Sequence, residues 1–196
     1  IVSGWNLGIA TKSQHQYGNL EINFQGTPNT EYVYPTSFPN VTSVVIRSQL
    51  ILTNGELNLD DDHNPFAGGK NIYIRSSNTA PIVRTNGYIR SETYGGLGNV
   101  IWRNTGGTTP TPSFTIPFAI DNSAPNYIPF TFASTAGKVD SIVVGTYGTI
   151  ASNVPYPPGV LHVNNLGGVD NSGQTVDRFW YINTTGSVTA ANIGYK

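Results

Sequence analysis

Residues 43–62, SVVIRSQLILTNGELNLDDD, decide the fold class of this chain. Apolar residues alternate with other residues in the segments around Leu50–Leu52 and Leu57–Leu59, as is typical of β-strands. Asn54-Gly55 separates these segments and is a turn pair. The apolar pairs recur about seven residues apart, which fits either a tight meander of short strands or a few coils of a β-solenoid.

The same pattern extends along the rest of the chain. Alternating segments recur from Leu20–Phe24 to Arg178–Ile182, with turn pairs such as Asn86-Gly87 and Gly106-Gly107 between them. The 22 glycines and 13 prolines also interrupt every window that could form a helix, and each costs about 1 to 3 kcal/mol inside one. We therefore predict an all-β protein, in which a short-stranded meander or β-solenoid-like segment packs on a β-sandwich.

Changes in strand length and proline content predict three segments. Residues 1–40 form N-terminal strands, residues 41–112 a short-stranded β segment, and residues 113–196 a β-sandwich-like segment with longer strands and more proline. Neither a long linker nor a block of charge separates the last two segments, so we expect them to pack together. They form either one domain or two.

Charge and composition exclude several classes of function. Ten basic and eleven acidic residues give a net charge of −1, which offers no long-range field for nucleic acid or an anionic membrane. The longest apolar runs are far shorter than the roughly 18 residues of a membrane helix. Cysteine is absent, which excludes disulfides and thiolate sites. The chain also starts at Ile1 instead of Met, so we expect a mature secreted protein, a proteolytic product or a fragment.

The sequence carries no recognisable catalytic motif. The nucleophile elbow G-x-S-x-G, the zinc motif H-E-x-x-H and the phosphate-binding loop are missing. The histidines are His15, His63 and His162, far apart in the chain. A glycosidase needs two carboxylates close together, and Glu21, Glu56 and Glu92 are the candidates for a pair that spacing alone does not reveal. We predict that the protein is not an enzyme.

The densest set of metal-ligating side chains is Asp60-Asp61-Asp62, followed by His63 and Asn64. Closely spaced oxygen ligands on a loop suit Ca²⁺. The EF-hand pattern with its distal glutamate is missing, and the alternative interpretation is a solvated acidic turn. We name these three aspartates as candidate Ca²⁺ ligands and expect no other cofactor.

Aromatic residues are candidates for sugar binding, because an aromatic face stacks on a sugar ring. The candidates in or beside predicted loops are Tyr32, Tyr34, Tyr94, Trp102, Tyr147 and Tyr156. The alternative is that these rings pack in the core and in turns.

Near the C-terminus we expect Arg178 either to pair with Asp177 or to cap a strand end.

Four segments, in order, carry a resemblance to a known family. They are LILTNGELNL (50–59), NGYIRSE (86–92), FTIPFAIDNSAPNYIPFTF (114–132) and TVDRFWYINTTG (175–186). They are similar to the "LxLxxGxL", "GYIR", "FPVG…YRPxTxT" and "VDRFWxI" motifs of β modules in Bacteroidetes surface proteins that are exported by type IX secretion. The match spans about residues 41–186, with Ile116-Pro117-Phe118 in place of the usual glycine turn. The resemblance implies a structural or adhesive module at the cell surface, without a catalytic role.

A modification site also depends on this resemblance. Asp140-Ser141-Ile142 resembles the Asp-Ser/Thr-apolar sequence at which Bacteroidetes O-glycosylate exported proteins. Ser141 is therefore a candidate glycosylation site.

The two ends of the chain suggest how the module is used. Both ends contain apolar, strand-like segments for which the sequence shows no partner strand, and such strands tend to pair with another chain. The residues expected to contact a neighbouring subunit are Ile1, Val2, Trp5, Leu7, Val188, Ile193 and Tyr195. We accordingly predict an extracellular, cell-surface structural protein, either a filament subunit or an adhesin module, which joins copies of itself or adjacent modules by strand complementation. The donor is 1–9 or 188–195. The alternative is a carbohydrate-binding module that recognises glycans.

Overall fold

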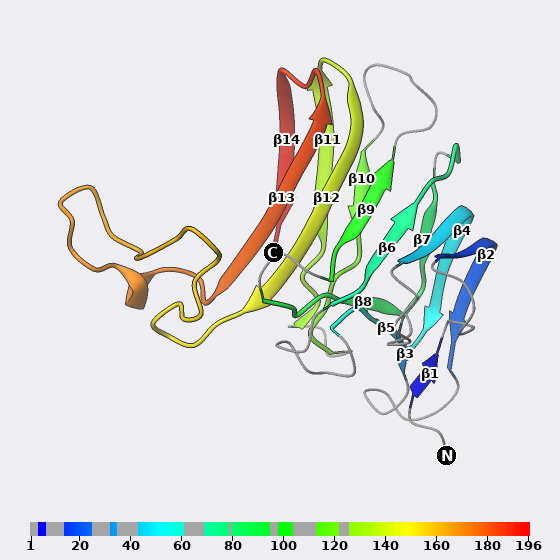
Figure 1. The fold of residues 1–196 in the computed structure, drawn as a ribbon, viewed down its shortest axis with the longest axis horizontal. Coiled ribbons are helices and arrows are strands. Elements are labelled where there is room, and N and C mark those ends of the chain that lie inside the picture. The colour runs from blue at the N-terminus through cyan, green and yellow to red at the C-terminus, as the bar shows by residue number, and fades with distance from the viewer. Residues whose placement is uncertain are drawn as a thin grey trace.

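The structure, a computed structural model, is all-β and describes residues 4–6, 14–24, 32–34, 43–60, 69–78, 80–94, 98–103, 113–121 and 126–196. Side chains in β1, in β3 and at the start of β2 lie outside this description. Figure 1 shows the strands and a single turn of 3-10 helix, η2 (Ser172–Gln174). The strands are β1 (Gly4–Asn6), β2 (Gln14–Asn23), β3 (Tyr32–Tyr34), β4 (Ser43–Asn54), β5 (Glu56–Asn58), β6 (Asn71–Ile74), β7 (Ile82–Arg84), β8 (Tyr88–Arg90), β9 (Val100–Arg103), β10 (Phe114–Ile116), β11 (Phe130–Ala136), β12 (Val139–Gly148), β13 (Arg178–Gly186) and β14 (Ala190–Tyr195).

The strands up to β9 stack in parallel as the coils of a solenoid. The first part of β4 pairs with β2 and β6, while its second part pairs with β2 and β7. A third set, β1, β3, β5 and β8, forms a separate parallel sheet. Each coil therefore places its strands on three sides of the solenoid. A meander would join neighbouring strands in antiparallel pairs, so the parallel registers decide between the two predicted arrangements in favour of the solenoid.

β9 joins the solenoid to the sandwich. It pairs in parallel with β6 and antiparallel with β12, and β12 pairs with β13. One seven-stranded sheet therefore runs through both parts in the order β13-β12-β9-β6-β4-β2, with β7 beside β4. A second antiparallel sheet, β10-β11-β14, packs against its β12–β13 end (Figure 1). The predicted segments 41–112 and 113–196 thus share a sheet and a core.

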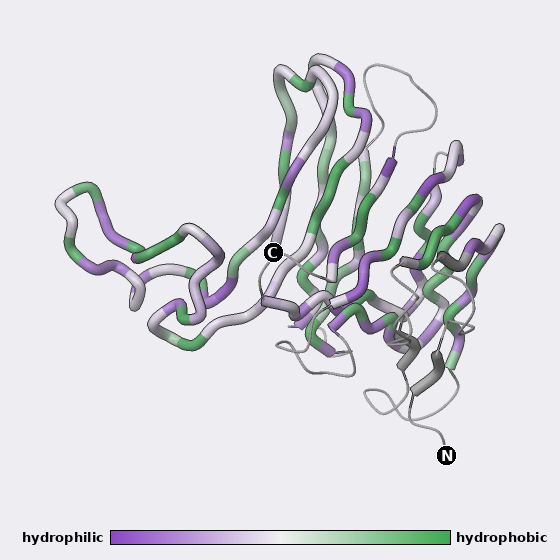
Figure 2. The backbone as a smooth tube through the Cα atoms, viewed as in Figure 1, coloured by the Kyte–Doolittle hydropathy of each residue, from purple (hydrophilic) through white to green (hydrophobic). Residues whose placement is uncertain are grey.

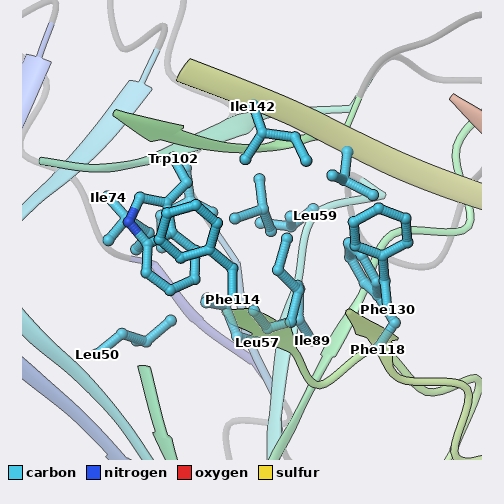
Figure 3. Packing of buried hydrophobic residues seen from close by; sticks show 14 of the residues in the cluster. Leu50, Leu57, Leu59, Ile74, Ile89, Trp102, Phe114, Phe118, Phe130 and Ile142 are labelled. Carbon is cyan, nitrogen blue, oxygen red and sulfur yellow. The ribbon is translucent and has the colours of Figure 1, made fainter. Parts of the chain in front are cut away.

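Aliphatic side chains at matching positions of successive coils form the core. Val44, Ile72 and Val100 are in register across three strands, and so are Ile46, Ile74 and Trp102. All are almost completely buried. Full burial of one such side chain contributes about 1.5–3 kcal/mol. Figure 3 shows this stack continuing into the sandwich through Leu57, Leu59, Ile89, Phe114, Phe118, Phe130 and Ile142.

The expectation that the terminal strands lack partners within the chain is wrong for the described strands. β1 pairs in parallel with β3, and β14 pairs antiparallel with β11 over almost its whole length. Val188 packs against the core. The predicted contact residues Ile1, Val2 and Leu7 lie outside the described residues, as does the side chain of Trp5. Apolar residues at the C-terminal end therefore complete this chain's own sandwich, so this segment is not a free donor.

A long arm, residues 149–177, connects β12 to β13 and projects away from the sheets (Figure 1). A hairpin connection usually takes about 2–5 residues, and β12 and β13 already pair directly from Gly148 and Arg178 onward. No residue of the arm belongs to the core. The arm therefore adds a separate surface at the open end of the sandwich.

Candidate functional site

An apolar groove lies at this end of the sandwich. Its volume is about 290 Å³. It lies between the arm and the last strands of the two sheets, β13 and β14. Its lining residues are Asn153, Val163, Thr175, Val176, Arg178, Phe179, Trp180 and Tyr195.

Ring contacts fix the aromatic wall of the groove. The ring of Trp180 lies 5.7 Å from Phe130 and 5.8 Å from Tyr195, between centroids, and so links β13 to both β11 and β14. On the arm side, the ring of Phe179 lies 5.9 Å from that of Tyr147. Such aromatic pairs each add about 0.5–1.5 kcal/mol beyond area burial. The wall is thus a preformed surface.

Both sheets end beside this groove. β13 is the last strand of the seven-stranded sheet and β14 the last of the three-stranded sheet. Within the described residues, neither strand pairs with a second strand on its outer side. Large apolar side chains are exposed on these two strands: Tyr181 at 45%, Ile193 at 48% and Tyr195 at 64%. Backbone hydrogen-bonding groups at a sheet edge together with apolar side chains can accept another strand.

The base of the arm is held by hydrogen bonds. Asn153 is buried, adopts a φ of 58°, and donates from Nδ2 to the carbonyl of Val176 at 3.0 Å. The hydroxyl of Tyr147 donates to the carbonyl of Pro155 at 3.0 Å. Burial, with a smaller effect of neighbouring Tyr94, raises the pKa of Tyr147 to about 12. These contacts position the side of the groove that the arm supplies.

Arg178 pairs with Glu92 and not with Asp177, so that part of our prediction is wrong. Its Nη1 lies 2.7 Å from Oε1 of Glu92, and it also donates to Oγ1 of Thr146 at 3.1 Å. The other carboxylate oxygen of Glu92 accepts from the backbone N–H of Gly148 at 2.8 Å. The carboxylate of adjacent Asp177 instead accepts a hydrogen bond from Nδ2 of Asn153 at 3.4 Å.

The three glutamates considered for catalysis each have a partner of their own. Glu21 accepts from Thr53 at 2.7 Å, Glu56 from Tyr88 at 2.8 Å, and Glu92 from Arg178. The first two bonds join neighbouring coils of the solenoid. Burial and the adjacent Glu56 carboxylate raise the pKa of Tyr88, so its hydroxyl keeps the proton that it donates. These hydrogen bonds give each of the three glutamates a structural role.

Asp60 is buried in an ion pair. Its Oδ2 lies 2.7 Å from Nε of Arg90, and the side chain of Asp60 is 0% exposed. Burial works to lower the pKa of Arg90, but Asp60 and Glu56 raise it overall. Asp60 is thus held inside the solenoid and is not on a solvated loop.

The rest of the acidic run, residues 61–64, lies outside the described residues. Among the residues that are described, no three acidic, histidine or cysteine side chains cluster in a way that could hold a metal ion. Ca²⁺ binding at Asp60, Asp61 and Asp62 stays a prediction.

The candidate sugar-contacting residues and the candidate modification site lie in different parts of the structure. Trp102 is buried in the core, with its ring tilted against that of Phe114 at 4.0 Å between centroids, so it is not available to a sugar. Tyr156 contacts the ring of Phe179 on the arm side of the groove. Ser141 lies in β12, where its hydroxyl is 2.8 Å from that of Thr185 on β13. Its glycosylation stays a prediction.

The sequence interpretation missed the groove itself. The alternation of DRFWYI indicated that β13 has one buried and one exposed face, and Tyr181 is on the exposed one. The arm carried a signal too, namely exposed apolar residues in a long proline-rich connection: Leu161, Leu166, Val169 and Val176. Loops of this length without strands are uncommon and usually functional.

Comparisons with known proteins return nothing: no protein-family model matches the chain, and neither a curated protein nor a solved structure is significantly similar to it. Among the described residues, no helix has the length and apolar character needed to cross a membrane.

Proposed function

We propose that this chain is a non-enzymatic, extracellular structural module that joins neighbouring copies at the β13–β14 end of its sandwich. The observation that carries this proposal is the apolar groove between two outermost strands, together with Tyr181, Ile193 and Tyr195, which are exposed on those strands. The two biological forms of such a module are a filament subunit and a cell-surface adhesin unit.

The joint works by strand addition. An extended segment of the neighbour lies along β13 or β14, and its backbone groups continue the hydrogen-bond ladder of that sheet. Every second side chain of the added strand faces the groove and contacts Trp180 and Tyr195, whose rings touch each other across β13 and β14. A one-residue slip would turn those side chains toward solvent, so the groove also fixes the register.

Strand order gives the joint a direction. The seven-stranded sheet ends in antiparallel β13 on one side and in parallel β2 on the other. The two ends differ, so contact between them is heterologous and repeats from copy to copy. β2, through its outer edge, is the strand that we propose the neighbour contributes, because β1 already pairs with β3 and β14 is part of the acceptor.

The cell-surface location rests on the sequence. The resemblance to exported Bacteroidetes modules implies it, and the low charge together with the absence of cysteine and methionine agrees with it. The paired carboxylates of Glu21, Glu56 and Glu92 support a non-enzymatic role, because each one has a structural partner.

Sedimentation velocity over a concentration series tests the assembly. The wild-type chain should form dimers and longer oligomers as its concentration rises. The double variant Tyr181→Lys/Ile193→Lys should stay monomeric, because two charges then face the joint. Val83→Lys, on β7 and similarly exposed, is the matched control and should assemble as the wild type does. A wild-type chain that stays monomeric at every concentration contradicts the proposal.

A carbohydrate-binding module is the second candidate. It is favoured by the aromatic wall of the groove, where Tyr195 is exposed and Trp180 is half-buried. In that case neutral oligosaccharides would quench tryptophan fluorescence in the wild type but not in Tyr195→Ala, and the chain would remain monomeric.

A further inference from the structure

Three arginines stack on the outer face of the seven-stranded sheet, at a distance from the groove along the sheet. They are the last residues of three similar segments, VVIR (44–47), IYIR (72–75) and VIWR (100–103). Each segment begins 28 positions after the one before it. Asn71 and Asn99, which are hydrogen-bonded between neighbouring coils, are separated by the same 28 positions. The residues before them, Ile46, Ile74 and Trp102, are in register and point into the core. Side chains alternate along a strand, so Arg47, Arg75 and Arg103 face outward, one above another.

The row continues into the sandwich with hydroxyl groups. Arg103 is in register with Ser141 on β12, and Ser141 with Thr185 on β13. Neighbouring strands lie about 4.8 Å apart, so these five side chains form a row roughly 19 Å long. Figure 2 shows the hydrophilic, purple ends of β6 and β9 side by side.

The three guanidinium groups have no carboxylate partner among the described residues. Arg47 donates to the amide oxygen of Gln16 at 2.9 and 3.1 Å, and Arg75 lies 5.2 Å above the ring of Tyr73. Nε of Arg75 is buried and has no hydrogen-bond partner among the described residues. The acidic residue beside Ser141, Asp140, pairs with Lys138 at 2.8 Å.

Without a bound anion, the row of three arginines lowers the stability of the fold. Like charges opposite each other on neighbouring strands are destabilising. The pKa of Arg75 is lowered by burial and by the charges of Arg103 and Arg47, which shows that the three groups act on one another. A ligand that carries regularly spaced negative charges would remove this repulsion.

We propose that the row Arg47–Arg75–Arg103–Ser141–Thr185 binds a linear acidic polysaccharide. Such a polymer carries a carboxylate on each sugar ring, and an extended ring has a length similar to the strand spacing. The arginines would bind successive carboxylates, and Ser141 and Thr185 would bind sugar hydroxyls. Nucleic acid fits less well, because single strands bind to successive exposed aromatic faces, and among the described residues Tyr73 is the one aromatic ring recorded against an arginine of the row. This site lies apart from the β13–β14 groove and does not depend on the proposed assembly.

Binding of fluorescently labelled polygalacturonate, followed by anisotropy, tests the site. The wild type should bind, whereas neutral dextran should not. Arg47→Gln/Arg103→Gln replaces two exposed groups, so it should remain folded and lose at least tenfold in affinity. Its slope of log affinity against log salt should fall by about two, one per removed contact. Arg75→Gln should also weaken binding. The double variant Lys70→Gln/Lys196→Gln has the same net charge as the double arginine variant and should bind as the wild type does.

Three results would overturn this assignment. One is the absence of wild-type binding to polygalacturonate. Another is an equal loss of affinity in the lysine control, which would mean that only net charge matters. The last is tighter binding of single-stranded oligo-dT, or of phosphatidylserine vesicles, than of polygalacturonate. Sedimentation of the arginine variants separates this test from the assembly proposal, because they should still oligomerise.

Discussion

Nη1 of Arg178 lies 2.7 Å from Oε1 of Glu92, and this ion pair connects the last long strand of the sandwich to the end of the solenoid. Both side chains are buried, at 8% and 11% exposure. The two residues are 86 positions apart in the chain. The pair therefore ties together the two parts of the molecule that share the seven-stranded sheet.

Replacing Arg178 by Met should lower the free energy of unfolding by about 3–5 kcal/mol, because a buried carboxylate is left without its partner. Glu92→Leu/Arg178→Met should recover most of that loss, since an apolar pair needs no compensating charge. Urea unfolding measures both. Lys138→Met, which removes an exposed pair with Asp140, is the control and should cost less than about 1 kcal/mol. Equal losses in all three variants would mean that burial of the pair is unimportant.

Asp60→Asn should destabilise the protein whether or not Ca²⁺ is present. The change removes the charge that pairs with Arg90, and the expected loss is about 3–5 kcal/mol for a broken buried pair. Thermal unfolding in Ca²⁺ and in EDTA provides the measurement. Stabilisation of the wild type by Ca²⁺ that disappears in Asp60→Asn would show instead that Asp60 is a metal ligand.

Ile74→Ala should cost about 2–5 kcal/mol, because a cavity would open between Ile46 and Trp102 in the stacked core. The matched apolar truncation is Leu166→Ala on the arm, where the side chain is fully exposed and the change should stay within about 0.5 kcal/mol. Chemical unfolding gives the change in the free energy of unfolding for both variants and so compares the core with the arm. A large loss in Leu166→Ala would contradict our description of the arm.

The residue pattern around 43–62 was sufficient to predict an all-β chain, because alternation and turn pairs are local signals. It left open the choice between meander and solenoid. The three segments that end in Arg47, Arg75 and Arg103 contain the deciding signal, since a fixed period of 20–50 residues is the mark of stacked coils. That 28-residue spacing is visible in the sequence alone.

The contacts of the site depended on distant parts of the chain. Glu92 is the partner of Arg178 because β12 carries β13 back toward the end of the solenoid, and adjacent Asp177 gave no indication of this. The C-terminal strand was expected to lack a partner because β11, with which it pairs, is more than fifty residues away in the sequence. Long-range antiparallel pairing has no local signature, so the groove could not be predicted from the sequence.

Stability should fall as the pH rises above 10, partly through Tyr147. Its pKa is about 12 in the folded protein and 10.0 ordinarily. A raised pKa means that the contribution of this residue is complete below pH 10.0 and is lost as the pH approaches 12. Tyr147→Phe lacks the ionising group, so its melting temperature should fall less than that of the wild type between about pH 9 and about pH 11. Parallel losses in the two proteins would show that Tyr147 does not contribute.

Hydrogen–deuterium exchange at low and high protein concentration tests the proposed assembly most directly. We predict that residues 178–186 and 190–195 gain protection as the concentration rises, because a neighbour's strand then covers the outer edges of β13 and β14. The core strand β6 should exchange equally slowly at both concentrations and is the internal reference. Unchanged exchange of β13 and β14, at a concentration where the chain is shown to be oligomeric, would contradict the account.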